Sequence, residues 1–486
     1  MTLPDTDPTY LVTRNPRLLP GLQEAHPALA RISILPDGGA ALKGAQLAAA
    51  LAYSPPLEEL RAGFTTHERV LVDEDLPLLQ HAATHVRTLQ VYAGGKPGDP
   101  TSLPVPLATS LRACADAVSA NSESLEATLY AVGAQAGEPA SDTDTAPLVA
   151  ALAGCTQLRC LGGVPFTAFS VPAFEQLAAA LSRPRSRFTH VNIWAADFGV
   201  HGAAIVRLLL PQLEVLRVRG DGRGELTDIV HAAMQSLAAG LRSGRALRLR
   251  ELRIPAAGAA AAAVYAALPF TQLRALQVET ESTAGSGNTL TLLAACLPAS
   301  LESLEFADIS DPWTWRQGRD ALLAAAAALP SLAHLAIRHQ GADDWTNYFD
   351  ADDGSAVART LLVPGAAPAL RSLQVGGGVT NNAVLDIALM LRINDSLTHL
   401  RVISTYLGGA TFVQLGEALR CNTTLRDLDI STSEPFHKRG LQAFADGLAV
   451  NEGLARLSLT LLQTDPSVCT RKTRKSITPS SASSLP

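Results

Sequence analysis

Three segments of the C-terminal part of the chain align with one another without gaps: LRINDSLTHLRV at residues 391–402, LRCNTTLRDLDI at 419–430 and LAVNEGLARLSL at 448–459. They share the pattern L-x2-N-x2-L-x2-L-x-[VIL], and they recur with periods of 28 and 29 residues. A period of about 20–50 residues is typical of proteins that stack copies of one short structural unit. The pattern therefore predicts a repeat architecture.

Each unit contains a predicted strand and a predicted helix. The L-x-[VIL] ending alternates between apolar and polar residues, as a strand with one buried face requires. The stretch before it has apolar residues at i, i+3, i+4 and i+7, the spacing of a helix with one buried face. In one unit these residues are Val384, Ile387, Ala388 and Leu391. The asparagine between helix and strand suits a C-cap or turn position, where left-handed backbone is tolerated.

The strand pattern recurs upstream, which gives fifteen candidate repeats spaced 24 to 39 residues apart. We number the strand positions from the first apolar residue, so that positions one, four and six are apolar. The residues at position one are Leu29, Leu57, Val86, Leu125, Cys155, Phe188, Leu213, Leu249, Leu273, Leu301, Leu332, Leu370, Leu397, Leu425 and Leu454. The unit at Leu125 is poor, because Thr128 occupies position four.

These residues resemble the leucine-rich-repeat family, and the long repeats resemble its ribonuclease-inhibitor-like subclass. The resemblance covers residues 25–462. It implies an α/β leucine-rich-repeat solenoid (horseshoe) of about 15 irregular repeats, with a concave parallel β-sheet and convex helices. The sequence departs from the family at position nine, where Asn or Cys is usual. The last four repeats have Gly378, Thr405, Ser433 and Leu462 there.

The pattern also divides the chain. Residues 1–24 are expected to form an N-terminal cap or extension, and residues 25–464 the solenoid. Residues 465–486 are rich in Ser and Thr and contain a basic cluster, so this tail is expected to be disordered. Whether the basic cluster is a targeting signal is left open.

Motifs for catalysis, cofactors and metals are missing from the sequence. It contains no phosphate-binding GxxxxGK[ST] loop, no GxSxG, no HExxH and no kinase motif set. The six cysteines have no zinc-site spacing. The segment Asp350–Gly354 lacks the spacing and the final Glu of a calcium loop. We therefore predict no catalytic residue, no cofactor and no metal. The apolar runs are too short to span a membrane.

Strand positions three, five and seven are expected to face the concave surface, because the side chains of a strand alternate between its two faces. In the central repeats these positions combine a tryptophan with three arginines, a composition typical of binding hot spots. The alternative is that Trp194 packs locally. The candidate partner-binding residues are His190, Asn192, Trp194, Arg217, Arg219, Glu251 and Arg253. The same register exposes Glu279.

A second candidate surface is a rim formed by the segments that follow two neighbouring strands. Tryptophan, tyrosine and aspartate gather there, and insertions in repeat proteins often belong to a binding face. The alternative is that the rings fill the long loops as small satellite cores. The candidate residues are Trp313, Trp315, Trp345 and Tyr348.

The sequence thus predicts a non-enzymatic protein–protein interaction scaffold. Its partner is expected to be a protein, because the exposed charges are of both signs and the net charge of −6 is mild. No nucleic acid, membrane or small-molecule substrate is expected. We expect a cytoplasmic monomer, with nuclear or cytoskeletal association left open. The alternative is a regulatory protein of GTPase-activating or ubiquitin-ligase-adaptor type built on the same repeats.

Overall fold

The structure is a computed structural model. It describes residues 10–13, 31–34, 57–64, 86–93, 126–131, 142–154, 158–162, 166, 169–220, 228–255, 258–279, 287–309, 312–339, 351–376, 379–404, 407–432 and 438–461. The chain divides into a first unit, Met1–Leu304, and a second unit, Glu305–Pro486.

The first unit alternates between strands and helices. Its strands are β1 (Tyr10–Thr13), β2 (Arg31–Ile34), β3 (Leu57–Phe64), β4 (Val86–Ala93), β5 (Glu126–Ala131), β6 (Cys160–Gly162), β7 (His190–Trp194), β8 (Val215–Arg219), β9 (Glu251–Pro255) and β10 (Ala275–Glu279). Its helices are α5 (Asp142–Gly154), α6 (Val171–Leu181), α7 (Ala195–Ala204), α8 (Asp228–Arg242), α9 (Gly258–Tyr265) and α10 (Gly287–Cys296), with short turns η3 (Ile205–Leu209) and η4 (Leu268–Phe270).

The second unit has the same alternation, and strand β11 (Ser303–Ile309) crosses the boundary between the units. The strands are β12 (His334–His339), β13 (Ser372–Gly376), β14 (His399–Ser404), β15 (Asp427–Thr432) and β16 (Arg456–Leu461). The helices are α11 (Pro312–Ala328), α12 (Ala351–Leu361), α13 (Asn381–Leu391), α14 (Gly409–Cys421) and α15 (Lys438–Leu448).

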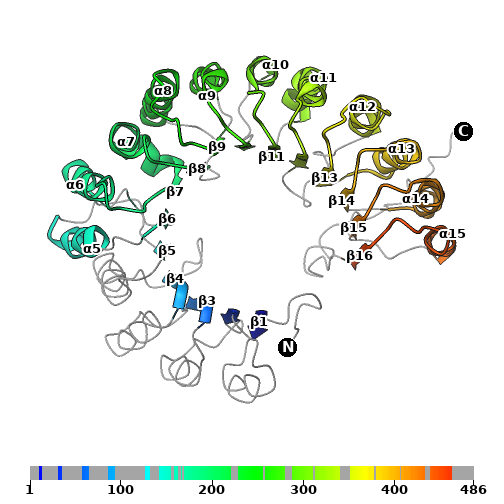
Figure 1. The fold of residues 1–486 in the computed structure, drawn as a ribbon, viewed down its shortest axis with the longest axis horizontal. Helices are drawn as coiled ribbons and strands as arrows, with labels where there is room; N and C mark the ends of the chain where they lie inside the picture. The colour runs from blue at the N-terminus through cyan, green and yellow to red at the C-terminus, as the bar shows by residue number, and fades with distance from the viewer. Residues whose placement is uncertain are drawn as a thin grey trace, which may run out of the picture. The chain divides into compact units, whose positions relative to one another are not determined.

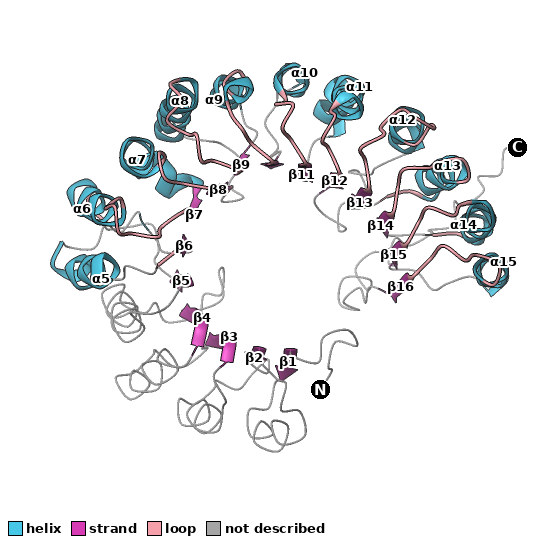
Figure 2. Ribbon diagram, viewed as in Figure 1, coloured by secondary structure: helices cyan, strands magenta, loops and turns pink. Residues whose placement is uncertain are grey.

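Every strand from β1 to β10 pairs in parallel with the next, and so does every strand from β12 to β16. Within each unit the helices lie on one side of the strands (Figure 1). Figure 2 shows the regular succession of a strand, a connection and a helix in both units. This architecture confirms the predicted fold class, an α/β leucine-rich-repeat solenoid.

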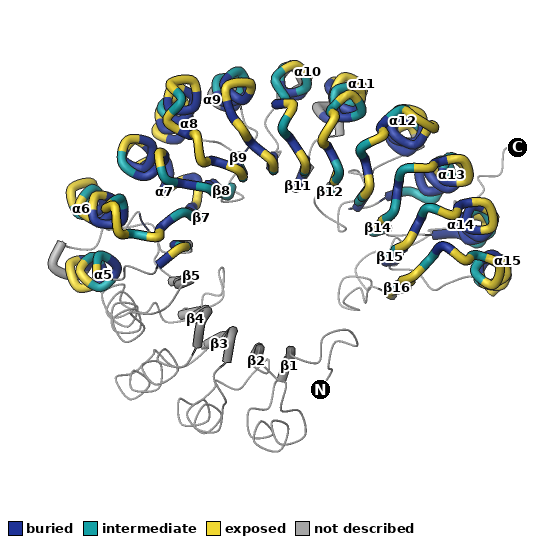
Figure 3. The backbone as a smooth tube through the Cα atoms, in the orientation of Figure 1, coloured by how far each residue is buried: buried dark blue, intermediate teal, exposed yellow. Residues whose placement is uncertain are grey.

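The core lies between the strands and the helices. On β7, Val191 and Ile193 are buried, whereas the residues between them are partly exposed. The same alternation holds on β8 and β9. Figure 3 colours the described helices and strands of both units by their burial. Burying one such aliphatic side chain stabilises the fold by about 1.5–3 kcal/mol. No single repeat can cover both sides of its apolar layer, so the stability comes from stacking.

The predicted strand register is wrong in two repeats. In the repeat predicted from Leu125, Ala127 pairs with Leu89 and Leu161, so position four is Ala127 and not Thr128. In the repeat predicted from Cys155, Leu161 pairs with Val191. Position four is therefore Leu161 and not Leu158, which shifts the register by three residues. Both leucines are buried. Leucines spaced by three satisfy the pattern in either of two registers, and the structure places a leucine instead of Cys155 at position one.

Asn422 is the C-cap residue of α14, one of the positions that the sequence suggested for these asparagines, but its backbone is not left-handed. Asn422 has φ −84° and ψ 121°, which is extended backbone. Its Nδ2 donates to the carbonyls of Leu391 (2.7 Å) and Asn394 (2.9 Å). Its Oδ1 accepts from the amides of Thr424 (3.1 Å) and Leu425 (2.8 Å). Asn394 and Asn451 repeat this arrangement one repeat earlier and later. The three side chains form an asparagine ladder that joins adjacent repeats.

Helices α14 and α15 approach each other through glycines. A Cβ atom on Gly416 would lie 2.4 Å from the carbonyl oxygen of Ala443. A Cβ atom on Gly447 would lie 2.2 Å from the carbonyl oxygen of Gly416. Only a residue without a side chain permits this contact between two backbones.

Strand β1 lies within residues 1–24, which the sequence predicts to be an extension, and it pairs in register with β2. The predicted tail, residues 465–486, lies outside the described residues. The number of about fifteen repeats stays a prediction.

A buried histidine is expected to make the first unit sensitive to acid. His201 on α7 is 1% exposed, its Nε2 lies 2.7 Å from the carbonyl oxygen of Phe166, and its ring stacks on Phe174. Burial lowers the pKa of His201 below its ordinary value of 6.5, and the bond to Phe166 opposes this only in part. The folded state therefore favours the neutral ring. Stability should be constant above about pH 6.5 and should fall as the pH drops from there towards the lowered pKa, because the unfolded chain takes up the proton first.

We expect a His201→Leu variant to lose part of this acid sensitivity. In the wild-type protein, His201 should lower the free energy of unfolding by up to about 1.4 kcal/mol for each pH unit below its ordinary pKa. The variant lacks this contribution. Hydrogen exchange of the α6 and α7 amides at pH 7.5 and 5.5 checks this. Equal acceleration of exchange in both proteins would contradict the assignment.

Candidate functional site

The first candidate surface is the face of the first unit that carries no helices. We define this helix-free face by strand positions three, five and seven of β7, β8 and β9. The structure places the seven predicted residues on it: His190, Asn192, Trp194, Arg217, Arg219, Glu251 and Arg253. All of them are half-buried or exposed, whereas the residues between them point into the core. The orientation predicted for these side chains is therefore confirmed.

The pairing of the strands arranges these side chains in rows. Asn192, Arg217 and Arg253 lie side by side at position five. Trp194 and Arg219 are direct neighbours at position seven. Side chains directly opposite each other on adjacent strands lie about 4.5–5.5 Å apart at Cβ. The tryptophan therefore has an arginine as its immediate neighbour.

Trp194 ends β7 and is the N-cap residue of α7. It leaves 38% of its surface exposed. Since the next residue, Ala195, is buried, the backbone turns inward at this point and leaves the ring on the helix-free face. A partly exposed indole with a fixed backbone supplies contact area at low entropic cost.

Two of the three predicted arginines are held by carboxylates. Arg217 Nε lies 2.5 Å from Glu251 Oε1, and Arg253 forms an ion pair with Glu279. Glu279 also accepts a hydrogen bond from the amide of Gly220 (2.8 Å) and is only 4% exposed, so the prediction that it faces solvent is wrong. Its two partners supply the hydrogen bonds that let a carboxylate be buried.

Arg219 differs from the other two arginines. Among the described residues it forms no ion pair, and its Nε is buried without a hydrogen-bond partner. A guanidinium beside a partly exposed indole can donate hydrogen bonds to a carboxylate or a carbonyl group of a partner. The candidate site on this face therefore centres on Trp194 and Arg219.

The corresponding face of the second unit carries ion pairs between adjacent strands. They join Arg338 to Glu305, Arg401 to Asp429 (3.1 Å) and Arg456 to Asp427 (3.2 Å). Burial lowers the pKa of Arg338, and the charge of Arg401 lowers it further. Exposed pairs of this kind contribute little to stability, about 0–1 kcal/mol each. They leave this face with charges of both signs.

The predicted rim is only partly described. Trp313 lies in the first turn of α11, and its side chain is not described. Trp345 and Tyr348 lie outside the described residues. Trp315 is 1% exposed, and its ring packs against Phe306. Trp315 therefore belongs to the core, and its placement on an exposed rim is wrong. Trp315 lies within helix α11, so the alternative, in which the rings fill long loops, does not describe it either.

Trp315 belongs to a buried polar cluster that sequence reasoning missed. Its Nε1 donates to Asp353 Oδ1 (2.9 Å), which also accepts from Arg319 (2.8 Å). Burial by itself lowers the pKa of Arg319, but its hydrogen bonds to Asp320 and Asp353 and their charges outweigh burial, so that this pKa is raised. These hydrogen bonds connect α11 to α12. Proline at the start of α11 and acidic residues at the start of α12 are signals that could have located both helix ends.

The described residues contain no group of three or more His, Cys, Asp or Glu side chains that could hold a metal ion. In the same part of the chain, no helix is both long and apolar enough to cross a membrane.

The fold defines the class of this protein as a leucine-rich-repeat solenoid. No protein-family model matches the chain, and no curated protein matches it. Several solved structures resemble parts of it, including the following two. One is the actin-binding site 2 of leiomodin-1, with 22% identity and a TM-score of 0.22 over 27% of this chain and 70% of that chain. The other is a Bacteroides fragilis protein, with 15% identity and a TM-score of 0.33 over 53% of this chain and 68% of that chain.

Proposed function

We propose that this chain is a non-enzymatic scaffold that binds a protein partner through the helix-free face of its first unit. The observation that carries the proposal is the pairing of Trp194 with Arg219. The indole is partly exposed on a face that none of the described helices covers, and the guanidinium beside it has no described ion-pair partner.

The surroundings of this pair support a protein partner. Tryptophan and arginine are the residue types most enriched among those that dominate binding energy. The neighbouring Arg217 and Arg253 are neutralised by carboxylates, so the face lacks the continuous positive charge that phosphate backbones favour. A partner with a carboxylate or carbonyl group beside an apolar contact would satisfy both side chains.

Several finer features belong to the same proposal. The chain would act as a cytoplasmic monomer of the ribonuclease-inhibitor-like subclass. Trp313, Trp345 and Tyr348 would form a second contact near the start of α11. Trp315 is not part of that contact.

A double variant, Trp194→Ala/Arg219→Ala, is expected to recover the main partner at least about tenfold less efficiently than the wild-type protein. Truncating a hot-spot residue typically costs about 2 kcal/mol or more of binding free energy. A loss of about 1.4 kcal/mol weakens binding tenfold. The measurement is quantitative mass spectrometry of proteins that purify with each form. It is followed by titration of the recovered partner, as a pure protein, against both forms.

The matched control is Phe270→Ala/Arg245→Ala, which removes an exposed aromatic ring and an exposed arginine from outside this face. This control should bind like the wild-type protein. Equal binding by the Trp194→Ala/Arg219→Ala variant would refute the site, provided that both variants unfold at the wild-type urea concentration.

A further inference from the structure

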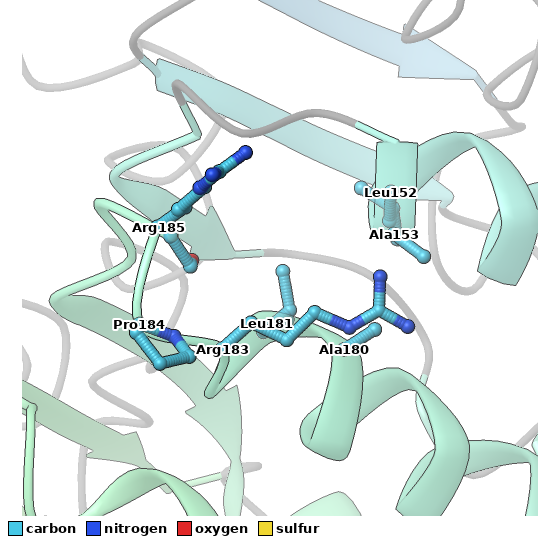
Figure 4. Close-up of a pocket in the computed structure, with 8 residues that line it drawn as sticks. Leu152, Ala153, Ala180, Leu181, Arg183, Pro184 and Arg185 are labelled. Atoms are coloured by element: carbon cyan, nitrogen blue, oxygen red, sulfur yellow. The ribbon is translucent and has the colours of Figure 1, made fainter.

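A cavity of about 380 Å³ lies where α5 and α6 end (Figure 4), and its described lining includes no residue of the helix-free face. Its apolar wall is formed by Leu152 and Ala153 at the end of α5 and by Ala180 and Leu181 at the end of α6. A cavity of this size can hold one or two large aliphatic side chains, and it lies in the range of natural ligand pockets.

Arginines stand at the mouth of this cavity. Arg183 and Arg185 line it, and in Figure 4 they leave the turn after α6 on either side of Leu181. Arg187 follows two residues later, and all three are exposed. We call this segment, residues 182–187, the arginine turn.

The arginine turn has a defined backbone. The amide of Ser186 donates to the carbonyl of Arg183 (2.9 Å), which closes a four-residue turn. Pro184 occupies the second position of this turn, where its fixed φ is favourable. The amide of Phe188, a buried residue, donates to Ser186 Oγ (3.2 Å) and anchors the end of the segment. The arginines are thus presented by a backbone that needs little further ordering on binding.

The usual structural role of basic residues after a helix does not account for them. Lysine and arginine often hydrogen-bond the last carbonyl groups of a helix. The last four carbonyls of α6, those of Ala178, Ala179, Ala180 and Leu181, already accept bonds from Ser182 N, Ser182 Oγ, Arg183 N and Gln212 Nε2, respectively. The guanidinium groups of the arginine turn are therefore not needed as caps.

Internal ion pairs do not account for the arginines either. In the part of the chain that the structure describes, no carboxylate lies within ion-pair distance of Arg183, Arg185 or Arg187. The glutamate of α6, Glu175, is engaged by Arg207 (2.5 Å). The described lining of the cavity contains no acidic residue. Two arginines therefore line an apolar cavity, and a third follows in the same turn, without a described counter-charge.

We propose that the arginine turn and its cavity bind an acidic peptide segment of a protein partner. An aliphatic side chain of that segment enters the cavity, and flanking carboxylates form bidentate pairs with Arg183 and Arg185. A peptide fits better than a single-stranded nucleic acid, because the described lining offers no aromatic ring on which a base could stack. This site is separate from the helix-free face and would give the scaffold a further contact.

The test uses the full chain and three fluorescein-labelled peptides, GDELEDG, GNQLQNG and GDESEDG, in fluorescence-polarisation titrations. The first peptide has both carboxylates and an aliphatic side chain, the second lacks the charges, and the third lacks the aliphatic group. We expect GDELEDG to bind at least about tenfold more tightly than either of the others. The same titrations with poly(U) and with phosphatidylserine vesicles test whether a nucleic acid or an anionic membrane binds more tightly than the acidic peptide.

Two variants locate the binding. Arg183→Gln/Arg185→Gln should weaken GDELEDG binding at least about tenfold, and Ala153→Phe, which fills the cavity, should do the same. The matched control is Arg245→Gln/Arg248→Gln, which removes two exposed arginines from the corresponding turn after α8 and should change nothing. The proposal would be overturned by no saturable binding up to about 1 mM, by equal losses in the control, or by tighter binding of poly(U) or the vesicles.

Discussion

Replacing Asp353 with alanine is expected to lower the free energy of unfolding of the second unit by about 3–5 kcal/mol, the cost of removing one partner from a buried ion pair. Asp353 has no exposed surface, and the Arg319 side chain that it holds is only 12% exposed. Alanine would leave the guanidinium in a medium of low dielectric constant without its buried counter-charge. It would also remove the described acceptor of the Trp315 indole.

Urea denaturation followed by tryptophan fluorescence measures this loss, and hydrogen exchange of α11 and α12 assigns it to the second unit. The matched control is Asp352→Ala, because Asp352 precedes Asp353 in the same helical turn but is exposed. It should change the free energy of unfolding by no more than about 0.5 kcal/mol. If the two variants unfold at the same urea concentration, the buried cluster does not stabilise the unit.

Asn422→Ala is expected to have an effect of similar size, about 3–4 kcal/mol. Each buried polar group left without a partner costs about 1–3 kcal/mol. This substitution removes the described side-chain partner of the Leu391 carbonyl and of the Thr424 and Leu425 amides, whereas the Asn394 carbonyl keeps a bond from Thr424 Oγ1 (3.3 Å). Three groups at the lower end of this range give the expected loss. Asn422 is 2% exposed, so water can replace these bonds only if the turn opens. Because the bonds join neighbouring repeats, hydrogen exchange should accelerate in α13 and β15 together.

An exposed asparagine on α13 supplies the comparison for that substitution. Asn382→Ala should leave the urea midpoint close to that of the wild-type protein. Acceleration of exchange confined to the turn after α14 would show that the asparagine ladder acts only locally and does not couple repeats.

Residues on strands could be placed from the sequence, because alternation allows only two orientations for a side chain. That rule put Trp194 and Arg219 on the same face, and the structure agrees. The rule gave the wrong register where two leucines spaced by three residues could each occupy position four, as at Leu158 and Leu161. Periodicity alone cannot decide between such registers.

Side-chain partners were not predictable in the same way. The ion pair between Arg253 and Glu279 joins two consecutive strands, β9 and β10, and the repeat pattern does not specify which charges on neighbouring strands meet. Trp315 was misplaced for a related reason. The segment after Phe306 has no long apolar period, so the start of α11 at Pro312 was not recognised and the ring was assigned to a loop. Trp315 lies near the start of α11 and Asp353 near the start of α12, so both helix starts must be predicted correctly before the hydrogen bond between the two side chains can be predicted.

The glycine contact between α14 and α15 bears on how this part of the array curves. Neighbouring strands in a sheet lie about 4.8 Å apart, whereas packed helices usually lie about 8–10 Å apart. A layer of helices therefore needs more length per repeat than the strands beneath it, and this mismatch produces the bend of a solenoid. Where Gly416 and Gly447 let two backbones touch, the mismatch shrinks. The final repeats should consequently be straighter than repeats whose helices are separated by larger side chains.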